Sequence, residues 1–445
     1  MSSDGRAGTA HEKPQVADSG THVVPRRYMT ADIPPIGGVI KQRPEDFLVD
    51  EVPQYEPVGT GEHIYMLVQK RGLSTMEMLE VLAGHFGVRR SALGYAGLKD
   101  KQALTRQVVS VHVPGKTIEE FPMLTHEKID VLWTDYHTNK LRHGHLRGNR
   151  FSVRIRNVKP TDVVIAHRVL ERLRYEGVPN RVGEQRFGML ENNHLVGRAL
   201  VVGDFEGAVQ LLLGPSATHP HLNHQGRELF VQRRFTEALA CYPNSARTEL
   251  RVLFQLSKGA SFKTALLNLD EPILRYYFSA FQSAVFNAAL DARIEDGLIG
   301  SLRAGDLAIK HENNAVFTVD EPVLADPATA ARLSRFEISP SGPLWGATMM
   351  RAGGRTDEVE LAALGALGVS VDQLNIFDER SRHTLDGKRR ALRVPVMDPE
   401  VEGGVDEHGA YVRCAFELPR GSFATVVLRE VMKPPVVSGE WEEPD

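Results

Sequence analysis

Apolar and polar residues alternate over two stretches of the chain, residues 109–113 and 151–156. An apolar side chain at every second position is typical of a strand with one buried face. We therefore predict a strand at each place. The polar positions of the second stretch include Arg154 and Arg156, so its other face is basic.

A stripe of apolar residues at helical spacing follows Ser74 and ends near Gly87. Ser74 and Glu77 have the spacing of a capping box, and glycine commonly ends a helix. A second segment, 161–175, carries apolar residues on one side and arginines on the other. These amphipathic patterns predict a helix in each segment.

The order of the remaining elements indicates that one domain is inserted into another. The patterns predict strands at 47–52, 63–69 and 411–418, and helices at 199–213, 272–295 and 422–432. Residues 193–392 are mostly helical, Ser422 is the expected N-cap of the last helix, and 340–346 is expected to be a loop with little local structure. Because exposed loops tolerate insertions, a β-rich, helical, β-rich order favours an inserted helical domain.

Length and composition limit the class of protein. The chain has 445 residues, 42% hydrophobic and 25% charged, which suits two or three globular domains and excludes collagen and a disulfide scaffold. Its two cysteines, Cys241 and Cys414, cannot build a metal cluster, and their scarcity fits a reducing compartment. Residues 1–20 lack an apolar signal region, and no apolar run is long enough to span a bilayer. We expect a cytoplasmic protein.

Positive charge is concentrated in one part of the chain. The net charge is only -4, but residues 140–186 hold twelve basic and four acidic residues, a net charge of +8. The segment 436–445 is an acidic tail. A concentration of this kind is what a phosphate-binding face needs, although an ordinary solvated face has the same pattern.

The densest group of unusual residues lies at 94–107. Asp100 stands between Lys99 and Lys101, on a short segment between a predicted helix and a predicted strand. A carboxylate placed there can act as a nucleophile or a general base, and neighbouring lysines favour its ionised form. The alternative is structural: Asp100 caps the turn and pairs with one of the two lysines.

Two further segments combine glycines with planar or basic side chains. Residues 140–151 interleave basic residues with Gly, Asn and Phe151, which suits RNA; the alternative is a surface hairpin with Phe151 in the core. Residues 177–188 form a tightly turned loop with Gln185 and Arg186 as planar donors, or else a plain interdomain linker. His221 and His224 have a ligand-like spacing but no visible partner set, so we expect no metal site.

At these segments the sequence resembles the TruD family of tRNA pseudouridine synthases. The first matching motif is Gly-Leu-Lys-Asp at 97–100, followed by Thr-Arg-Gln at 105–107. The second spans 140–151, begins with Lys-Leu and ends with Gly-Asn-Arg-Phe. The third spans 177–188, begins with Gly-Val-Pro-Asn and ends with Gln-Arg-Phe-Gly. Motifs at 41–47 and 418–425 also agree, so the resemblance covers about residues 36–432. The chain departs from the family pattern at Arg181 and Val182, where an aromatic residue is usual.

The resemblance implies an α+β fold. A pseudouridine synthase catalytic domain, a mixed curved sheet with flanking helices, is interrupted by an inserted, largely helical TRUD domain. We place the catalytic domain at 31–176 plus 394–435 and the insertion at 177–393, after a disordered leader at 1–30. The insertion is expected to form one wall of an RNA-binding cleft.

The resemblance also implies a reaction and its residues. A uridine of tRNA, at position 13 in most members, is flipped out and isomerised to pseudouridine without a cofactor or a metal. Asp100 is the catalytic carboxylate, and its exact step stays open. The implied substrate-binding residues are Phe47, Asn149, Phe151 and Phe423. The expected supporting or RNA-binding residues are Lys41, Lys99, Lys140, Arg142, Arg147, Gln185 and Arg186. The expected partner is tRNA, and the expected state is a monomer.

Two other functions are compatible with parts of the sequence. A non-catalytic RNA-binding or RNA-folding protein could use the same cleft. A hydrolase could use Asp100 with Lys99, although this leaves the basic strand at 151–156 unexplained.

Overall fold

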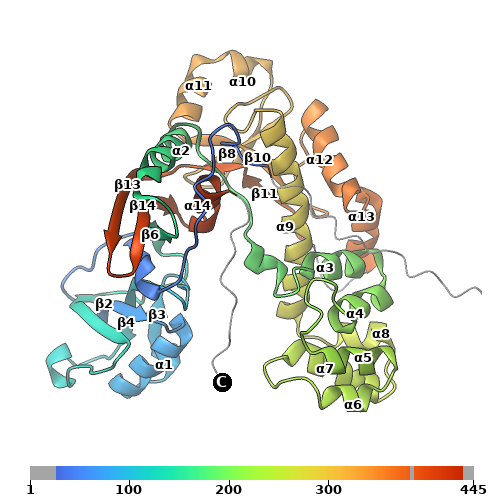
Figure 1. The fold of residues 1–445 in the computed structure, drawn as a ribbon, viewed down its shortest axis with the longest axis horizontal. Coiled ribbons are helices and arrows are strands. Elements are labelled where there is room, and N and C mark those ends of the chain that lie inside the picture. Colours follow the sequence, from blue (N-terminus) through green and yellow to red (C-terminus); the bar gives the residue numbers. More distant parts are fainter. Residues whose placement is uncertain (1–26, 381–384, 434–445) are drawn as a thin grey trace, which may run out of the picture.

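The computed structural model describes residues 27–380 and 385–433. The expected acidic tail and most of the expected leader therefore lie outside the described residues. The elements form two arms that meet at one end, like an inverted V (Figure 1). One arm holds a large β-sheet with α1, α2 and α14, and the other is built around the long helix α9.

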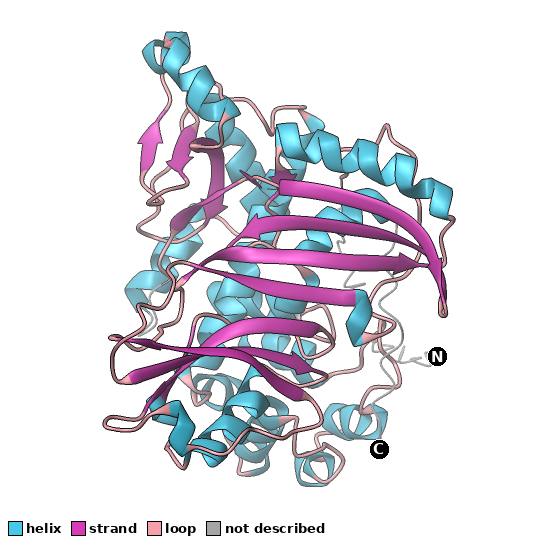
Figure 2. Ribbon diagram, turned by 90° about the vertical axis from the view of Figure 1, so that its left-hand side faces the viewer, coloured by secondary structure: helices cyan, strands magenta, loops and turns pink. Residues whose placement is uncertain are grey.

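The first arm contains an eight-stranded sheet in the order β13-β14-β6-β1-β4-β2-β5, with β3 also paired to β4. β1 and β4 are parallel, and the other neighbours are antiparallel. Figure 2 shows that the sheet is strongly curved. The expected mixed curved sheet is thus present. Its strands are β1 (Phe47–Pro53), β2 (His63–Arg71), β3 (Leu93–Tyr95), β4 (Leu104–His112), β5 (Ile129–His137), β6 (Leu146–Arg156), β13 (Met397–Asp406) and β14 (Gly409–Pro419).

Three helices cover one face of this sheet: α1 (Thr75–Phe86), α2 (Val163–Glu176) and α14 (Ala424–Met432). The predicted capping box of α1 is present, and Gly87 ends that helix with a positive φ of 63°. The predicted N-cap of α14 is wrong. Phe423 occupies the cap position, because Gly421 turns the chain at φ 80° and Ser422 is still part of that turn.

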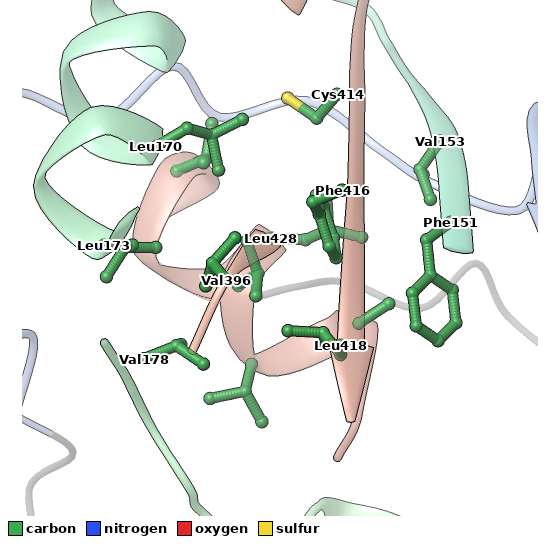
Figure 3. Packing of buried hydrophobic residues seen from close by; sticks show 14 of the residues in the cluster. Phe151, Val153, Leu170, Leu173, Val178, Val396, Cys414, Phe416, Leu418 and Leu428 are labelled. Atoms are coloured by element: carbon green, nitrogen blue, oxygen red, sulfur yellow. The ribbon is translucent and has the colours of Figure 1, made fainter. Parts of the chain in front are cut away.

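The core between the sheet and these helices follows from strand alternation. Every second residue of β6 and β14 points toward α2 and α14, so Val153, Cys414 and Phe416 pack against Leu170 and Leu428. Figure 3 shows these side chains converging, with Phe151 at the margin of the group. A second cluster packs α1 against β2 and β4 on the same face. Burial of these apolar surfaces supplies the main stabilisation of the arm.

The second arm contains more strand than the sequence predicts. A four-stranded sheet runs in the order β11-β10-β8-β9. The segment 340–346, expected to be a loop, belongs largely to β10 (Ile338–Leu344). β10 pairs with β8 over 338–340 and with β11 over 341–344, so each half has a partner on one side and tolerates its proline. The other strands are β8 (Leu307–Lys310), β9 (Val316–Thr318) and β11 (Lys388–Ala391).

The helices of this arm lie where the sequence pattern predicts them, but one predicted helix is divided into two. The helix predicted at 199–213 is two helices, α3 (Asn193–Val202) and α4 (Phe205–Leu213), because Gly203 adopts φ 79° and Asp204 caps α4. The helix predicted at 272–295 is α9 (Glu271–Glu295). The remaining helices are α5 (His224–Val231), α6 (Phe235–Leu239), α7 (Arg247–Ser257), α8 (Phe262–Leu267), α10 (Glu321–Ala325), α11 (Pro327–Ser334), α12 (Gly354–Ala366) and α13 (Val371–Arg380).

The chain passes between the arms through two paired segments, β7 (Val178–Pro179) and β12 (Arg393–Val394). The loop after β7 is fastened to α9, because Arg181 forms a buried ion pair with Asp291 and Val182 exchanges two backbone-to-amide hydrogen bonds with Asn287. This gives the two residues that depart from the family pattern a local structural role. The segment is therefore not a loose linker.

The N-terminal end of the described chain is packed against α14. Thr30 is fully buried, and Met29 and Thr30 donate backbone hydrogen bonds to the Glu430 carboxylate. The expected disordered leader is thus too long by residues 27–30, because these backbone donors have a buried acceptor. Of the helices in the described part of the chain, none has the length and apolar character needed to cross a membrane.

Candidate active site

A group of buried polar side chains interrupts the helix-covered face of the sheet. Lys70 of β2 is paired in register with Thr105 of β4, and Gln107 and Glu51 lie beside them. All four are buried, at 0% exposure for Lys70, Thr105 and Gln107. Buried polar groups require partners. Half of the hydrogen-bond partners of Lys70, Gln107 and Glu51 come from the segment that carries Asp100, namely Gly97, Lys99 and Asp100. The Thr105 hydroxyl has no partner among the described residues.

These buried side chains bind the backbone and the Lys99 side chain of the segment that carries Asp100. The Lys70 ammonium donates to the backbone oxygen of Asp100 at 2.8 Å and to that of Leu73 at 2.6 Å. The Lys99 ammonium forms an ion pair with Glu51 at 2.5 Å, in which both side chains are almost fully buried. The Lys99 backbone N–H also donates to the Thr75 hydroxyl at 2.9 Å. The backbone around Asp100 is therefore fixed at several points.

Lys70 is an unusual member of this group. Its ammonium has no ion pair with any described residue, and burial lowers its pKa to about 8, partly offset by the Asp100 carboxylate. Removal of a lysine charge from water is costly unless a carboxylate lies against it. The site therefore keeps a desolvated cation directly behind the Asp100 backbone.

The Asp100 carboxylate itself points to the open side. Its side chain is 38% exposed, and one oxygen lies 3.2 Å from the Lys41 ammonium. The expected supporting role of Lys41 is thus given a geometry. The structural alternative, in which Asp100 pairs with a neighbouring lysine, is not what the chain does, because Lys99 pairs with Glu51 and Lys101 with Glu77.

The four implied substrate-binding residues differ in accessibility. Phe47 is 1% exposed and Phe151 7%, with their rings edge to face at 6.3 Å. Phe423 is 41% exposed, at the start of α14. Asn149 lies opposite Glu51 in the sheet, and its buried amide oxygen has no hydrogen-bond partner among the described residues. Phe423 thus offers an exposed ring and Asn149 a buried, unpartnered acceptor, whereas Phe47 and Phe151 belong to the core.

A pocket of about 650 Å³ lies where the two arms meet, which we call the junction pocket. Its cations come from both arms: Arg147, Lys388, Arg389, Arg390 and Arg420, against one acid, Glu312. Arg389 is neutralised by a buried ion pair with Glu360. The pocket walls therefore present four remaining cations, a suitable charge for phosphate groups.

Of the four cations without a buried carboxylate partner, Arg390 is the most desolvated. It donates to the side-chain oxygen of Asn180 at 2.6 Å, stands over the Phe286 ring, and forms no ion pair with a described carboxylate. Burial, together with the nearby Arg186 charge, lowers its pKa to about 10, so it stays charged at neutral pH. A cation held in place without a carboxylate partner is suited to bind an anionic ligand.

The basic run at 140–186 is less basic in space than in sequence. Half of its twelve cations pair with carboxylates, among them Arg150 with Glu400 and Arg156 with Asp46 and Asp406. Arg156 is fully buried, so the predicted basic face of the strand at 151–156 is mostly neutralised. Arg142, Arg147 and Arg186 form no ion pair with any described residue.

The other expected RNA-binding residues are divided between two places. Arg147 lines the junction pocket, whereas Lys140 and Arg142 line a separate hollow beside it. Gln185 is exposed, and the Arg186 guanidinium stacks over the Tyr276 ring. Lys99 is buried in its ion pair and is a supporting residue only. No cluster of metal-ligating side chains occurs within the described ranges.

Sequence reasoning missed Lys70, Glu51 and Arg390. Each is a charged residue inside a strand, Lys70 and Glu51 at positions that alternation assigns to the buried face. A lysine or glutamate at a buried strand position is rare, and this rarity is the one feature of the sequence that could have identified Lys70 and Glu51.

Comparison with known proteins decides the family. A family model described as tRNA pseudouridine synthase D (TruD) matches residues 24–431. The chain belongs to the TruD family. A TruD protein of Geobacter sulfurreducens is 42% identical over 411 residues, covering 92% of this chain and 97% of its own. Another, from Anaeromyxobacter sp., is 37% identical and covers 91% and 95%.

A solved structure confirms the TruD fold. The crystal structure of a Methanosarcina mazei protein described as TruD superposes with a TM-score of 0.79 at 28% identity, covering 91% of this chain and 95% of that one. The α+β class expected from the sequence is therefore confirmed. Membership in the TruD family makes the chain a pseudouridine synthase that acts on tRNA.

Proposed function

We propose that this TruD protein converts uridine 13 of tRNA to pseudouridine, with Asp100 as the catalytic carboxylate. One observation carries the assignment to Asp100. Its backbone is fixed by Lys70 and the Lys99–Glu51 pair, while its carboxylate stays 38% exposed beside Lys41. A rigid support with an accessible reactive group is what a catalytic residue needs.

The reaction is an isomerisation, so its atoms balance without a second substrate. The N1–C1′ bond of the uridine breaks, the uracil turns, and a C5–C1′ bond forms. The hydrogen on C5 leaves as a proton, and N1 gains one. A carboxylate can take part by attacking C1′, by attacking the base, or by removing the proton on C2′. Deuterium at C2′ distinguishes the last route, because only that route gives a primary isotope effect.

In this proposal two groups without a partner in the protein recognise the flipped uridine. The exposed Phe423 ring stacks on the uracil, and the buried, unpartnered Asn149 amide oxygen accepts a hydrogen bond from it once the base has entered the site. Lys41 holds the Asp100 carboxylate. The junction pocket binds the RNA backbone through Arg147, Arg390 and Arg420 from both arms.

The domain division follows the course of the chain. We propose a catalytic domain at 31–176 plus 394–435 and an inserted domain at 177–393, meeting at the β7–β12 pair. We also propose that the chain acts in the cytoplasm, where tRNA is its substrate, and that it works as a monomer.

The decisive experiment maps pseudouridine in an unmodified tRNA transcript after incubation with the purified protein alone. We expect a single new pseudouridine at position 13. Asp100→Asn is expected to abolish it and to leave the Kd for tRNA within about threefold, because shape is retained and only the charge is lost. Modification at another position would overturn the specificity, and an active Asp100→Asn variant would overturn the assignment of Asp100. Tight tRNA binding without any modification would favour a non-catalytic RNA-binding protein.

A further inference from the structure

A second hollow lies next to the junction pocket, and the proposed catalytic role does not use it. This side pocket has a volume of about 500 Å³, within the range of small-ligand sites. Adjacent residues of the same two segments line the two hollows. Gln54 and Leu146 line the junction pocket, whereas Tyr55 and His145 line the side pocket. A single strand that leaves the junction pocket along these segments therefore reaches the side pocket directly.

The wall of the side pocket is an ordered set of rings. The Tyr55 ring stacks on His137 with centroids 5.2 Å apart and meets His145 edge to face at 5.6 Å. The Tyr55 hydroxyl is 2.8 Å from Nδ1 of His145. Tyr65 fixes the arrangement further, because its ring contacts His137 and its hydroxyl donates to the backbone oxygen of Asn139. The rings are therefore held in position before any ligand arrives.

The polar groups around these rings include two cations. The Arg142 guanidinium is exposed and has no ion pair with any described residue. Lys140 lines the same hollow, and its ammonium donates to the backbone oxygen of Ser91 at 2.5 Å, which leaves its other two N–H groups for a ligand. His137 is more than nine-tenths buried, and its Nδ1 has no hydrogen-bond partner among the described residues. Val58, on the rim, is an exposed apolar side chain at 57%. An aromatic wall, an apolar rim and two cations thus occur within one small cavity.

We propose that the side pocket binds an unpaired nucleotide of the RNA substrate, separate from the uridine that reacts. The base stacks against the Tyr55–His145 wall, and its phosphate lies against Arg142 and Lys140. The exposed Glu56 carboxylate, also in the lining, accepts hydrogen bonds from an amino or imino group on the base edge. This inference rests on the proposed function, because it identifies a second contact of the same RNA.

An RNA nucleotide fits these features better than other ligands of similar size. A small dianion would use the two cations and leave the aromatic wall without a role. A peptide side chain would use the rings but would gain little from two cations. Only a group with a flat aromatic face and an attached negative charge uses the whole cavity, and a nucleotide in a single-stranded region has both.

The test compares binding of a tRNA transcript by variants of the full chain. All are made in the Asp100→Asn background, so that no turnover occurs during the measurement. Tyr55→Leu removes the stacking face, Tyr55→Phe keeps the ring, and Arg142→Gln removes one cation. Arg355→Gln, an exposed arginine of α12, is the matched control. Thermal unfolding of each variant checks that it is folded.

We expect Tyr55→Leu to raise the Kd about 5- to 150-fold, the range for loss of one stacked base. Arg142→Gln should weaken binding and lower the slope of log Kd against log salt by about 0.7, the value for one single-strand phosphate. Arg355→Gln should bind like the parent. Tyr55→Phe keeps the stacking face and loses only the contact with His145, so it should lose much less affinity than Tyr55→Leu. Ultraviolet crosslinking should join a nucleotide other than the target to the segment 55–58 or 142–145, and the crosslink should vanish in Tyr55→Leu.

Three outcomes would overturn the inference. An unchanged Kd for both Tyr55→Leu and Arg142→Gln excludes a nucleotide in the side pocket. A loss in Tyr55→Phe as large as in Tyr55→Leu excludes stacking as its basis. If Tyr55→Leu binds tRNA more weakly but also melts at a lower temperature, and Arg142→Gln binds like the parent, the Tyr55 ring contributes to stability alone. Failure of the proposed function is seen separately, because the protein with Asp100 intact then forms no pseudouridine, while the Kd comparison still decides the subsite.

Discussion

Lys70→Met is the change that tests most directly how the catalytic segment is held. The Lys70 ammonium is completely buried and binds the backbone oxygens of Asp100 and Leu73, without an ion pair to any described residue. We expect the variant to stay folded at pH 7, with a loss of at most about 3 kcal/mol in the free energy of unfolding. Its single-turnover rate should fall about a hundredfold, the loss that a displacement of a reactive group by about 1 Å can cause.

The expected loss of stability is limited because two effects oppose each other. Lowering the lysine pKa from 10.5 to about 8 on folding costs about 3 kcal/mol at pH 7, and methionine avoids this cost. Methionine also leaves two backbone oxygens without a donor, at about 1–3 kcal/mol each. The sum lies between about 1 kcal/mol of stabilisation and about 3 kcal/mol of destabilisation.

The pH dependence gives the sharper test. Above pH 8 the folded state releases the Lys70 proton while the unfolded state keeps it until about pH 10.5, so the stability of the unmutated protein rises with pH in this window. Between pH 7 and 9.5 about 2 kcal/mol is regained. Lys70→Met lacks this gain, so its deficit relative to the parent should grow by about 2 kcal/mol over the same range.

The assay is urea unfolding at pH 7 and 9.5, together with single-turnover pseudouridine formation. Lys263→Met, an exposed lysine of α8, serves as the control and should match the parent in both measurements. A deficit of several kcal/mol that does not change with pH would show that Lys70 is charge-paired in the folded protein. Unchanged turnover with a well-folded variant would show that its bond to the Asp100 backbone has no role in catalysis.

Three further predictions follow from burial and pairing. Lys99→Met should destabilise the protein by about 3–5 kcal/mol in urea unfolding, because it leaves the buried Glu51 carboxylate unpaired; a smaller loss would mean that water reaches Glu51. Phe151→Ala should lower the free energy of unfolding by about 3–5 kcal/mol, because the ring is buried in the core. Phe423→Ala should lower it by under about 1 kcal/mol and should instead lower kcat/KM by the equivalent of about 1–3 kcal/mol of stacking. The reverse pattern would make Phe151 the stacking residue. Arg147→Gln should lower the salt dependence of tRNA affinity by about one phosphate contact without a change in melting temperature, and an unaltered slope would remove Arg147 from the RNA path.

The sequence predicts the first arm well because its elements obey simple periodicities. Strands β1, β2 and β6, helix α1 and its capping box all lie where alternation and helical spacing place them. The sequence also singled out the segment around Asp100, because glycines, a carboxylate and lysines gather there, and its catalytic role stays a prediction. These features are local, and local patterns can be recognised without knowing what packs against them.

The errors have a common physical origin in tertiary contacts. Segment 340–346 has two prolines and two glycines, so it resembles a loop, yet β8 and β11 supply partners that make most of it a strand. The basic run at 140–186 resembles a phosphate-binding face, yet acids such as Asp46 and Glu400, which are distant in sequence, neutralise half of it. Propensity and charge counts cannot include partners that only the folded chain brings near.

The proposed RNA-binding surface draws on both arms. Arg147 and Arg420 come from the arm that holds Asp100, whereas Lys388 and Arg390 come from the other. Arg390 also donates to the backbone of Gly421, two residues before the exposed Phe423 ring. The pairing of β7 with β12 fixes both arms at this point, and α9 contributes Phe286 and Leu290 to the core of the first arm. The geometry of the site therefore depends on the junction, so a change that loosens β7–β12 should weaken RNA binding even though it touches no RNA-facing residue.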